Sequence, residues 1–237
     1  MNKGVYMLSW KNGELIRSVI YSVLSNGFNY PSKELVEEMQ NGNFLEILSH
    51  ATFKLSINDI EIKHSLETIN NYIETWNGMN YENLLKELQV EYTRIFIGPM
   101  YVPCPPYESV YREGLVMQKS TIEVIETYAE AGLEISTNYK DNPDHIGAEL
   151  EFMHYLCKNS EEAINEDNIE KMLKFLTIQE RFIRDHILIW INKFCDDIIH
   201  TTTVDFYKGL AMVTKVYLKL ELERVENLIS EVKKPRN

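Results

Sequence analysis

The chain has 237 residues, of which 44% are hydrophobic, so it is long enough to bury a full core as one large domain. Its 36 acidic residues against 24 basic ones give a net charge of -12, which disfavours nucleic acid as a partner and would attract cationic peptides. Its three cysteines have no C-x-x-C spacing, which argues against a disulfide framework and a local zinc or iron–sulfur motif, so we expect an intracellular protein.

The N-terminal third of the chain shows helical periodicity. Apolar residues recur at steps of three and four from Leu15 to Leu24, and Gly27 is expected to end this helix. Pro31 and Ser32 open the next one. Helices are then expected over residues 33–40, 44–55 and 59–76.

A Pro-rich segment, residues 98–111, interrupts the helices. Asn80 is expected to cap the helix that leads into it, and Gly98 with Pro99 should end that helix. Four of the seven prolines lie between Pro99 and Pro106, so this segment should follow a stiff, extended path. Tyrosine rings held on a stiff segment could form a recognition surface for a peptide. Alternatively, the same rings could pack onto the helices. These rings belong to Tyr101, Tyr107 and Tyr111.

The middle of the chain predicts two more helix starts. Residues 120–123 read STIE, a capping box. After a polar link at residues 136–142, Asn142 is expected to cap a helix with Pro143 at its first position and Asp144 in its first turn, where the helix dipole favours a carboxylate. One flank of this helix could border a groove. That flank consists of His145, Glu149 and Phe152.

Two long helices are expected to close the chain. They cover residues 167–199, with a break near Thr177, and residues 204–232. Residues 182–190 are apolar around more than half of the helix circumference, which predicts a central buried segment. Within it, His186 is expected to be a core histidine bonded to a carbonyl or carboxylate group.

No strand pattern and no repeat competes with the helical signals. The expected fold class is therefore all-α, a single large helical domain of roughly ten to twelve helices. Two lobes, residues 1–135 and 143–237, could form within it on either side of the polar link. No uncharged stretch is long enough to span a bilayer, so we expect a cytoplasmic protein without membrane insertion.

The sequence offers few candidates for a catalytic or metal-binding site. His145 and Glu149 lie four residues apart on one helix face and could supply two metal ligands. His154 points to the opposite side and a third ligand is missing, so we expect no metal site and leave a metal-dependent hydrolase as an alternative. Ser109 lacks the G-x-S-x-G elbow, and Cys104 has no neighbouring cation to activate it. We expect no enzyme and no cofactor.

Four runs of sequence resemble one protein family. Residues 91–99 read EYTRIFIGP, residues 105–111 read PPYESVY and residues 143–150 read PDHIGAEL. The TorD/DmsD family shows E-Y-x-x-L-F-x-G-P, P-P-Y-E-S-V-Y and D-H-x-x-x-E-L in the same order. Residues 182–194, FIRDHILIWINKF, are similar to the family helix F-x-x-x-H-L-x-x-W-x-x-x-F. By this resemblance, which spans roughly residues 80–220, the chain is identified as a member.

The resemblance implies a cytoplasmic chaperone for redox enzymes. Such a chaperone binds the twin-arginine signal peptide, or the apo form, of a molybdopterin-dependent oxidoreductase until cofactor insertion and folding are complete. The implied partners are the catalytic subunit of that enzyme and its signal peptide, with the chaperone as a monomer or a domain-exchanged dimer. A permanently bound helical subunit of an anaerobic oxidoreductase is a further alternative. Tyrosines replace the tryptophans that some members carry near the Pro-rich segment, so ligand preference is expected to differ from theirs.

We expect the peptide to lie in one groove between the helix end at residues 96–99, the Pro-rich segment and the helix start at Asp144. Aromatic rings would contact its apolar stretch, and carboxylates would pair with its arginines. His145 could modulate release with pH, donate to the peptide backbone or fasten the Pro-rich segment to the helix. The expected peptide-binding residues are Phe96, Pro99, Pro106, Tyr107, Glu108, Tyr111, Asp144, His145 and Glu149.

Overall fold

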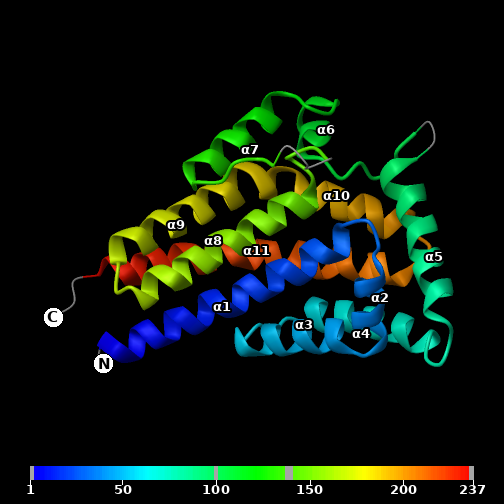
Figure 1. Ribbon diagram of the computed structural model, residues 1–237, viewed down its shortest axis with the longest axis horizontal. Helices are drawn as coiled ribbons and strands as arrows, with labels where there is room; N and C mark the ends of the chain where they lie inside the picture. The colour runs from blue at the N-terminus through cyan, green and yellow to red at the C-terminus, as the bar shows by residue number, and fades with distance from the viewer. Residues whose placement is uncertain (1–2, 99–100, 137–140, 235–237) are drawn as a thin grey trace.

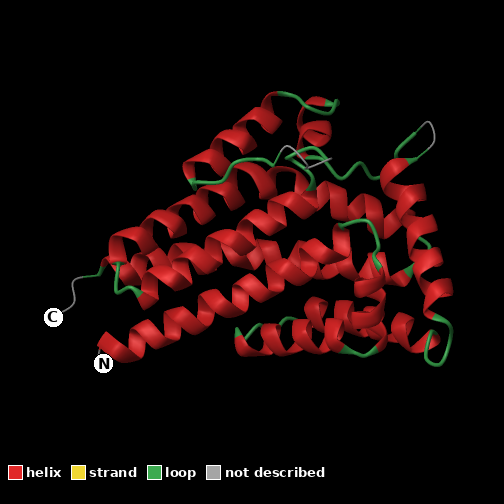
Figure 2. Cartoon of the chain, in the orientation of Figure 1, coloured by secondary structure: helices red, strands yellow, loops and turns green. Residues whose placement is uncertain are grey.

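The computed structural model describes residues 3–98, 101–136 and 141–234. These residues form eleven α-helices, two π-helical segments and no β-strand (Figure 2), so the expected all-α fold is confirmed. The first elements are α1 (Lys3–Phe28), α2 (Lys33–Gln40), α3 (Asn43–Lys54), α4 (Ile60–Thr75), α5 (Tyr81–Tyr92) and the π-helical η1 (Thr93–Ile97). The others are α6 (Glu108–Glu113), α7 (Lys119–Glu130), α8 (Ile146–Asn165), α9 (Ile169–Phe182), the π-helical η2 (Ile183–Ile187), α10 (Leu188–Thr201) and α11 (Asp205–Lys233).

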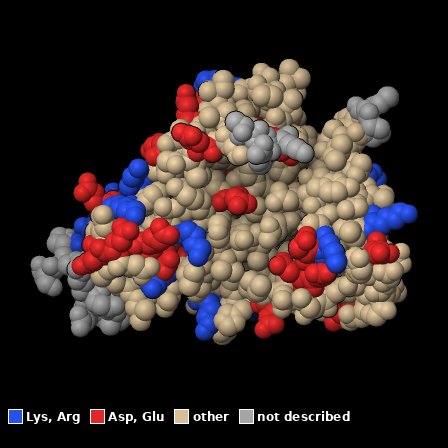
Figure 3. All heavy atoms as spheres, viewed as in Figure 1, with Lys and Arg blue, Asp and Glu red and all other residues tan. Residues whose placement is uncertain are grey.

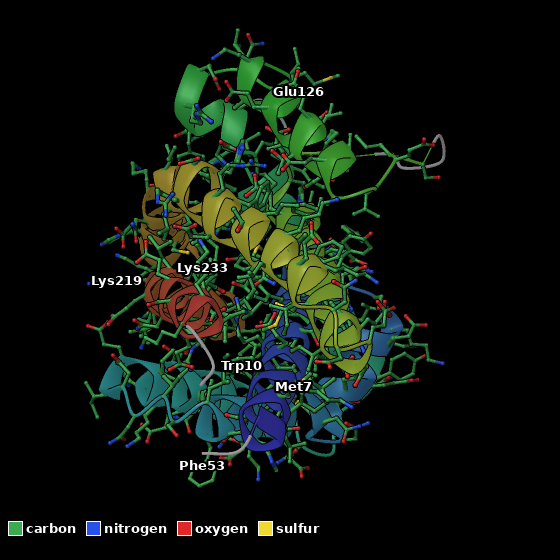
Figure 4. The ribbon with its side chains drawn as sticks, turned by 90° about the vertical axis from the view of Figure 1, so that its left-hand side faces the viewer. Met7, Trp10, Phe53, Glu126, Lys219 and Lys233 are labelled. Atoms are coloured by element: carbon green, nitrogen blue, oxygen red, sulfur yellow. The ribbon has the colours of Figure 1, made fainter. Side chains whose placement is uncertain are left out.

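The long helices α1, α8, α9, α10 and α11 form the body of the molecule (Figure 1). α1 packs against α8, α8 against α9, and α10 against α11. The α6–α7 pair covers one side of this body, and α3 and α4 cover the opposite side, where α4 packs against α11. Figure 4, turned by 90°, shows the same layers, with Glu126 of α7 at one edge and Phe53 of α3 at the other.

Local side chains cap the starts of α2, α4 and α5, of which the cap by Asn80 was expected. The side-chain oxygens of Ser32, Asp59 and Asn80 each accept a backbone N–H from the first turn of α2, α4 and α5, at 3.2, 2.7 and 2.9 Å. These caps satisfy donors that have no partner inside the helix. A polar residue at the expected helix start predicts these caps well, because the donor and acceptor are only two or three residues apart in the sequence.

The capping box expected at residues 120–123 is wrong. α7 already begins at Lys119, and its first turn has no side-chain cap. The hydroxyl of Ser120 instead donates to Glu113 Oε2 at 2.8 Å, while Glu113 Oε1 accepts the Ser120 backbone N–H at 3.3 Å. Ser120 therefore ties α7 to the end of α6, a tertiary contact that its local sequence does not reveal.

Gly27 does not end the first helix. α1 continues to Phe28, and a Cβ atom on Gly27 would lie 2.9 Å from two side-chain carbons of Leu210. Such a distance is too short for a carbon–carbon contact. The glycine thus allows α1 and α11 to pack closely, and its role belongs to the core rather than to the helix end.

The expected break near Thr177 lies elsewhere. α9 runs unbroken to Phe182, and the irregular stretch is η2, where the hydrogen bonding changes to the π pattern. π-helical turns occur often at functional sites. η2 carries His186, whose Nδ1 lies 3.1 Å from Glu108 Oε2, so the expectation of a core histidine bonded to a carboxylate is confirmed.

The core lies among the long helices. Of residues 182–190, which were expected to form a central buried segment, only one side faces the core: Trp190 is 1% exposed, whereas Ile189 is 53% exposed. The three cysteines are buried and unpaired. Within the described ranges, no helix is both long enough and apolar enough to cross a membrane.

The polar link at residues 136–142 includes residues 137–140, which lie outside the described residues. The segments on its two sides are packed together, because Ser25 of α1 donates its hydroxyl to the carbonyl oxygen of Gly147 in α8 at 2.8 Å. The division into lobes 1–135 and 143–237 stays a prediction.

Candidate functional site

The end of the Pro-rich segment pairs with the residues that precede α8. The backbone N–H of Ile146 donates to the carbonyl oxygen of Pro106 at 2.9 Å, and the N–H of Glu108 donates to the carbonyl oxygen of Asp144 at 3.0 Å. Tyr107 and His145 thus form an isolated antiparallel bridge. We call these two paired stretches, residues 106–108 and 144–146, the junction. It unites two of the sequence motifs on which the family resemblance depends.

α8 starts later than its sequence predicts. His145 is the N-cap, and its Nδ1 accepts the backbone N–H of Gly147 at 3.0 Å. Asn142, the expected cap, lies in a preceding turn, where its carbonyl oxygen accepts the N–H of His145 at 3.1 Å. Pairing with Tyr107 holds residue 145 in an extended conformation, so the helix begins only after it.

His145 is a neutral side chain in this position. Burial lowers its pKa, an effect that the carboxylates of Asp141 and Asp144 oppose. Because Nδ1 accepts from Gly147, the proton of the neutral ring lies on Nε2. That atom is 3.5 Å from the hydroxyl oxygen of Tyr92 and 3.9 Å from Asp141 Oδ2. His145 therefore fastens the helix start to its neighbours, one of the three roles considered for it.

The tyrosines of the Pro-rich segment differ in their surroundings. Tyr107 is half-buried and packs edge-to-face against His145, with 5.4 Å between the ring centres. Its hydroxyl donates to Asp141 Oδ1 at 2.9 Å. Tyr111 lies on α6, packs against Trp190 at 5.5 Å between ring centres and donates to Asp197 at 3.2 Å. Tyr111 thus anchors α6 to α10, and both side chains remain partly exposed.

The three expected carboxylates are fully buried, each at 0% exposure. Glu108 accepts from Arg112 at 2.6 Å and from His186 at 3.1 Å. Asp144 accepts the backbone N–H of Ser109 at 2.9 Å, but its Oδ1 has no partner in the structure. These groups hold the junction from inside, and none of them offers a free oxygen at the surface.

Glu149 is the most unusual of the three. Trp190 donates its indole N–H to Oε2 at 3.2 Å, while Oε1 has no partner. Burial raises the pKa of Glu149 well above its ordinary value, and the neighbouring Glu108 carboxylate raises the pKa further.

Phe96 does not join the junction. Phe96 is 3% exposed and packs in the core against Tyr92, Phe194 and Tyr207, with ring centres 4.8 to 5.9 Å away. Pro99 lies outside the described residues. Peptide contact through these two positions stays a prediction.

The residues considered for metal binding serve other purposes. His145 Nδ1 is occupied by the helix cap, and His154 Nδ1 lies 2.7 Å from the carbonyl oxygen of Ser18. Among the residues that the structure describes, no group of three or more histidine, cysteine, aspartate or glutamate side chains is placed to hold a metal ion. The geometry therefore offers the hydrolase alternative no metal centre.

A pocket of about 540 Å³ opens directly beside the junction. It lies between the first turns of α8, the end of α7 and the stretch that follows α7, and Tyr128 closes one side by donating its hydroxyl to the carbonyl oxygen of Pro143 at 2.9 Å. Its apolar lining comes from Tyr128, Leu133, Ile135, Pro143, Ala148, Phe152 and Tyr155. Two exposed carboxylates, Glu134 and Glu151, lie at its edge, and no ion pair of theirs appears among the described residues.

Gly147 shapes the floor of this pocket. A Cβ atom there would lie 2.4 Å from Asn29 Oδ1 and 3.1 Å from His145 Nδ1. Glycine thus lets Asn29, from the turn after α1, approach the start of α8. Two segments that are far apart in the sequence meet at this point.

Sequence reasoning missed most of the pocket. Of its lining residues, only Phe152 was expected to border a groove, whereas Pro143 was considered as a helix start and His154 as a metal ligand. A periodic signal was present, since Ala148, Glu151, Tyr155 and Lys158 recur at steps of three and four along one face of α8. The contribution of Leu133 and Ile135 depends on the path of the chain after α7, which has no local signal.

Comparisons with known proteins agree with the sequence motifs. A family model described as "Nitrate reductase delta subunit" matches residues 58–196, more than half of the chain. A crystal structure of a redox enzyme maturation protein from Archaeoglobus fulgidus has 24% identity and a TM-score of 0.49, and covers 85% of this chain and 93% of that one.

Curated relatives extend the match. A protein of Vibrio atlanticus named "Chaperone protein TorD" is 28% identical over 214 residues, which are 87% of this chain and 93% of the relative. A protein of Haemophilus influenzae named "Probable Tat proofreading chaperone DmsD" is 26% identical over 135 residues, 56% of this chain and 59% of the relative. The chain therefore belongs to the nitrate reductase delta subunit family of TorD- and DmsD-like maturation chaperones.

Proposed function

We propose that this protein is a cytoplasmic chaperone that binds the signal peptide of a molybdopterin-dependent oxidoreductase and holds the apo enzyme until its cofactor is inserted. Family membership supports the chaperone role, and the name of the Haemophilus influenzae relative connects that protein with Tat proofreading. Peptide binding requires no bond-making chemistry, in keeping with relatives that are named chaperones rather than enzymes.

The observation that carries the proposal is the pocket beside the junction. A volume of about 540 Å³ lies within the range of sites that bury a ligand, and its lining is mainly apolar and aromatic. Figure 3 shows that uncharged atoms dominate the centre of this face, where α8 passes in Figure 1. An apolar stretch of a signal peptide would bury its side chains against Phe152 and Tyr155.

Two of the three glutamate or lysine side chains among the described residues that line the pocket, Glu134 and Glu151, suit the arginines of such a peptide, and the third is Lys158. Glu134 and Glu151 are exposed and can form charge-assisted hydrogen bonds with guanidinium groups. The net charge of -12 would in addition speed the encounter with a cationic segment. In this proposal the buried carboxylates of the junction support the pocket wall, and the edge carboxylates contact the arginines.

Titration calorimetry against signal peptides from the molybdoenzymes of the same genome tests this proposal. The double variant Glu134→Gln/Glu151→Gln is expected to weaken binding by about tenfold, because two charge-assisted bonds become neutral ones. The matched control is Glu67→Gln/Glu162→Gln, which changes the net charge equally at exposed positions outside the pocket. This control should bind like the wild type, apart from a weak effect that salt removes.

Three outcomes separate the alternatives. Equal losses in both double variants would show that only overall charge matters and that the pocket is not the site. Binding that survives arginine-to-glutamine changes in the peptide would assign the affinity to apolar burial, because glutamine removes the positive charge that lysine would keep. Tight binding to the mature enzyme without any preference for its signal peptide would favour a permanently bound subunit.

A further inference from the structure

Three buried acidic side chains converge behind the junction, with few positive charges to balance them. Glu108 begins α6, Glu149 lies in the first turn of α8, and Asp144 precedes that helix; all three are at 0% exposure. The cationic groups in contact with the cluster are Arg112, which is bound to Glu108, and His186 when it is protonated. Three ionised carboxylates at this density would repel one another strongly.

The donors around the cluster are unequally shared. Glu108 receives Arg112 on Oε1 and His186 on both oxygens, so it is the carboxylate best placed to carry the charge. Glu149 receives only the neutral indole N–H of Trp190, on Oε2. Its Oε1 is buried and has no donor. A buried oxygen without a partner is costly, and a proton on Glu149 would give this side chain a hydrogen bond to donate.

We infer that Glu149 is a neutral carboxylic acid whose O–H donates to the Glu108 carboxylate, and that this bridge positions the junction beside the pocket. The bridge joins the start of α6 to the first turn of α8, on the side of the junction that faces the core. The part of this inference that concerns the pocket rests on the proposed function. The protonation state of Glu149 is independent of the proposed function.

The remaining charged groups around the bridge leave this assignment intact. Glu123 of α7 also pairs with Arg112, with 3.3 Å between Glu123 Oε2 and an Arg112 guanidinium nitrogen. The positive charge of Arg112 is therefore divided between Glu108 and Glu123. From the residues before α8, Asp144 raises the pKa of Glu149 further. α10 contributes the uncharged Trp190, and η2 contributes His186, which bonds to Glu108. No cation among the described residues contacts Glu149 directly.

The bridge explains how the junction can be rigid. Its outer side depends on two backbone hydrogen bonds, from Ile146 to Pro106 and from Glu108 to Asp144. Its inner side would depend on the carboxyl pair. If Glu149 were truncated, Glu108 and Trp190 would each lose a partner, and the Tyr107 side of the junction could move relative to α8.

Glu149→Gln is the decisive variant, because an amide can accept from Trp190 and donate to Glu108 without a titrating proton. Urea unfolding of the wild type and of E149Q is measured between pH 5 and pH 8. Folded Glu149 keeps a proton that an unfolded glutamate loses above a pH of about 4.3. The unfolding constant of the wild type should therefore rise relative to that of E149Q by about tenfold per pH unit, until folded Glu149 ionises.

A difference between the two proteins that does not change with pH would overturn the inference, since it would mean that Glu149 is ionised in the folded state. Infrared spectroscopy of the wild type gives an independent measurement if E149Q fails to fold. A buried protonated carboxyl group should show a carbonyl stretch at neutral pH. Absence of that band would equally overturn the assignment.

Peptide binding separates this inference from the proposed function. Glu149→Ala is expected to weaken binding of a signal peptide by about tenfold, and Glu149→Gln should restore most of the affinity. If the pH-dependent stability difference appears but no peptide binds, the carboxyl bridge stands and the proposed function fails. If peptide binds but E149A and E149Q lose affinity equally, the bridge does not position the site.

Discussion

Arg17 of α1 donates its Nε to Glu221 Oε2 of α11 at 2.7 Å, and both side chains are buried. The same guanidinium also pairs with Glu14, one turn earlier on α1. Tyr21 donates its hydroxyl to Glu221 at 3.1 Å, and Gln179 of α9 donates to Glu14 at 3.0 Å. The first and last helices are thus joined through a buried polar network.

Replacement of Arg17 by methionine should therefore be strongly destabilising. It would leave buried Glu14 without a cation and buried Glu221 with only the partly exposed Arg224, whose Nε lies 3.2 Å from Glu221 Oε1. Removing one partner of a buried ion pair costs about 3–5 kcal/mol. The matched control is Lys33→Met in the exposed ion pair with Glu37, for which we expect a change of less than about 1 kcal/mol. Urea unfolding followed by circular dichroism measures both. Similar small values for the two variants would show that the buried network does not stabilise the fold.

Gly147→Ala should disturb the pocket floor and lower stability by about 1–3 kcal/mol, because its Cβ would lie 2.4 Å from Asn29 Oδ1. Gly13→Ala on α1 is the matched control. No atom lies within 4 Å of its added Cβ, so it should stabilise the helix by about 0.5–1 kcal/mol. Asn29→Ala combined with Gly147→Ala should recover part of the loss. Thermal unfolding of all variants tests the contrast, and a destabilisation that Asn29→Ala does not relieve would contradict the steric explanation.

Because His145 is buried, we expect the free energy of unfolding to fall in mild acid. Its pKa is lowered by burial, so the unfolded state takes up a proton below a pH of about 6.5 that the folded His145 resists. Its contribution is complete above that pH and is lost as the pH falls toward the folded pKa. In His145→Asn, which keeps a helix-capping oxygen, this part of the pH dependence should disappear.

The measurement is thermal unfolding of wild type and His145→Asn between pH 5 and pH 8. The difference between the two proteins removes the contribution of the other histidines. At pH 8 the free energies of unfolding of the two proteins should differ by no more than about 0.5–2 kcal/mol, the usual contribution of an N-cap residue. A difference that stays constant across this range would indicate that His145 titrates alike in the folded and unfolded states.

The sequence by itself determined those features that depend on neighbouring residues. Ser32, Asp59 and Asn80 cap their helices because a short polar side chain reaches the N–H groups two or three positions ahead. The all-α class followed from apolar residues at helical spacing. The family motifs were visible because they are contiguous, and they identified both stretches of the junction.

Only the tertiary structure decided how those stretches act together. Nothing near His145 in the sequence shows that pairing with Tyr107 delays the helix start and makes a histidine the cap. Phe96 is a core residue and Glu149 a buried acid because of helices that arrive from elsewhere in the chain. Burial and pairing depend on the sum of long-range contacts, whereas sequence periodicity reports only which face of a helix is apolar.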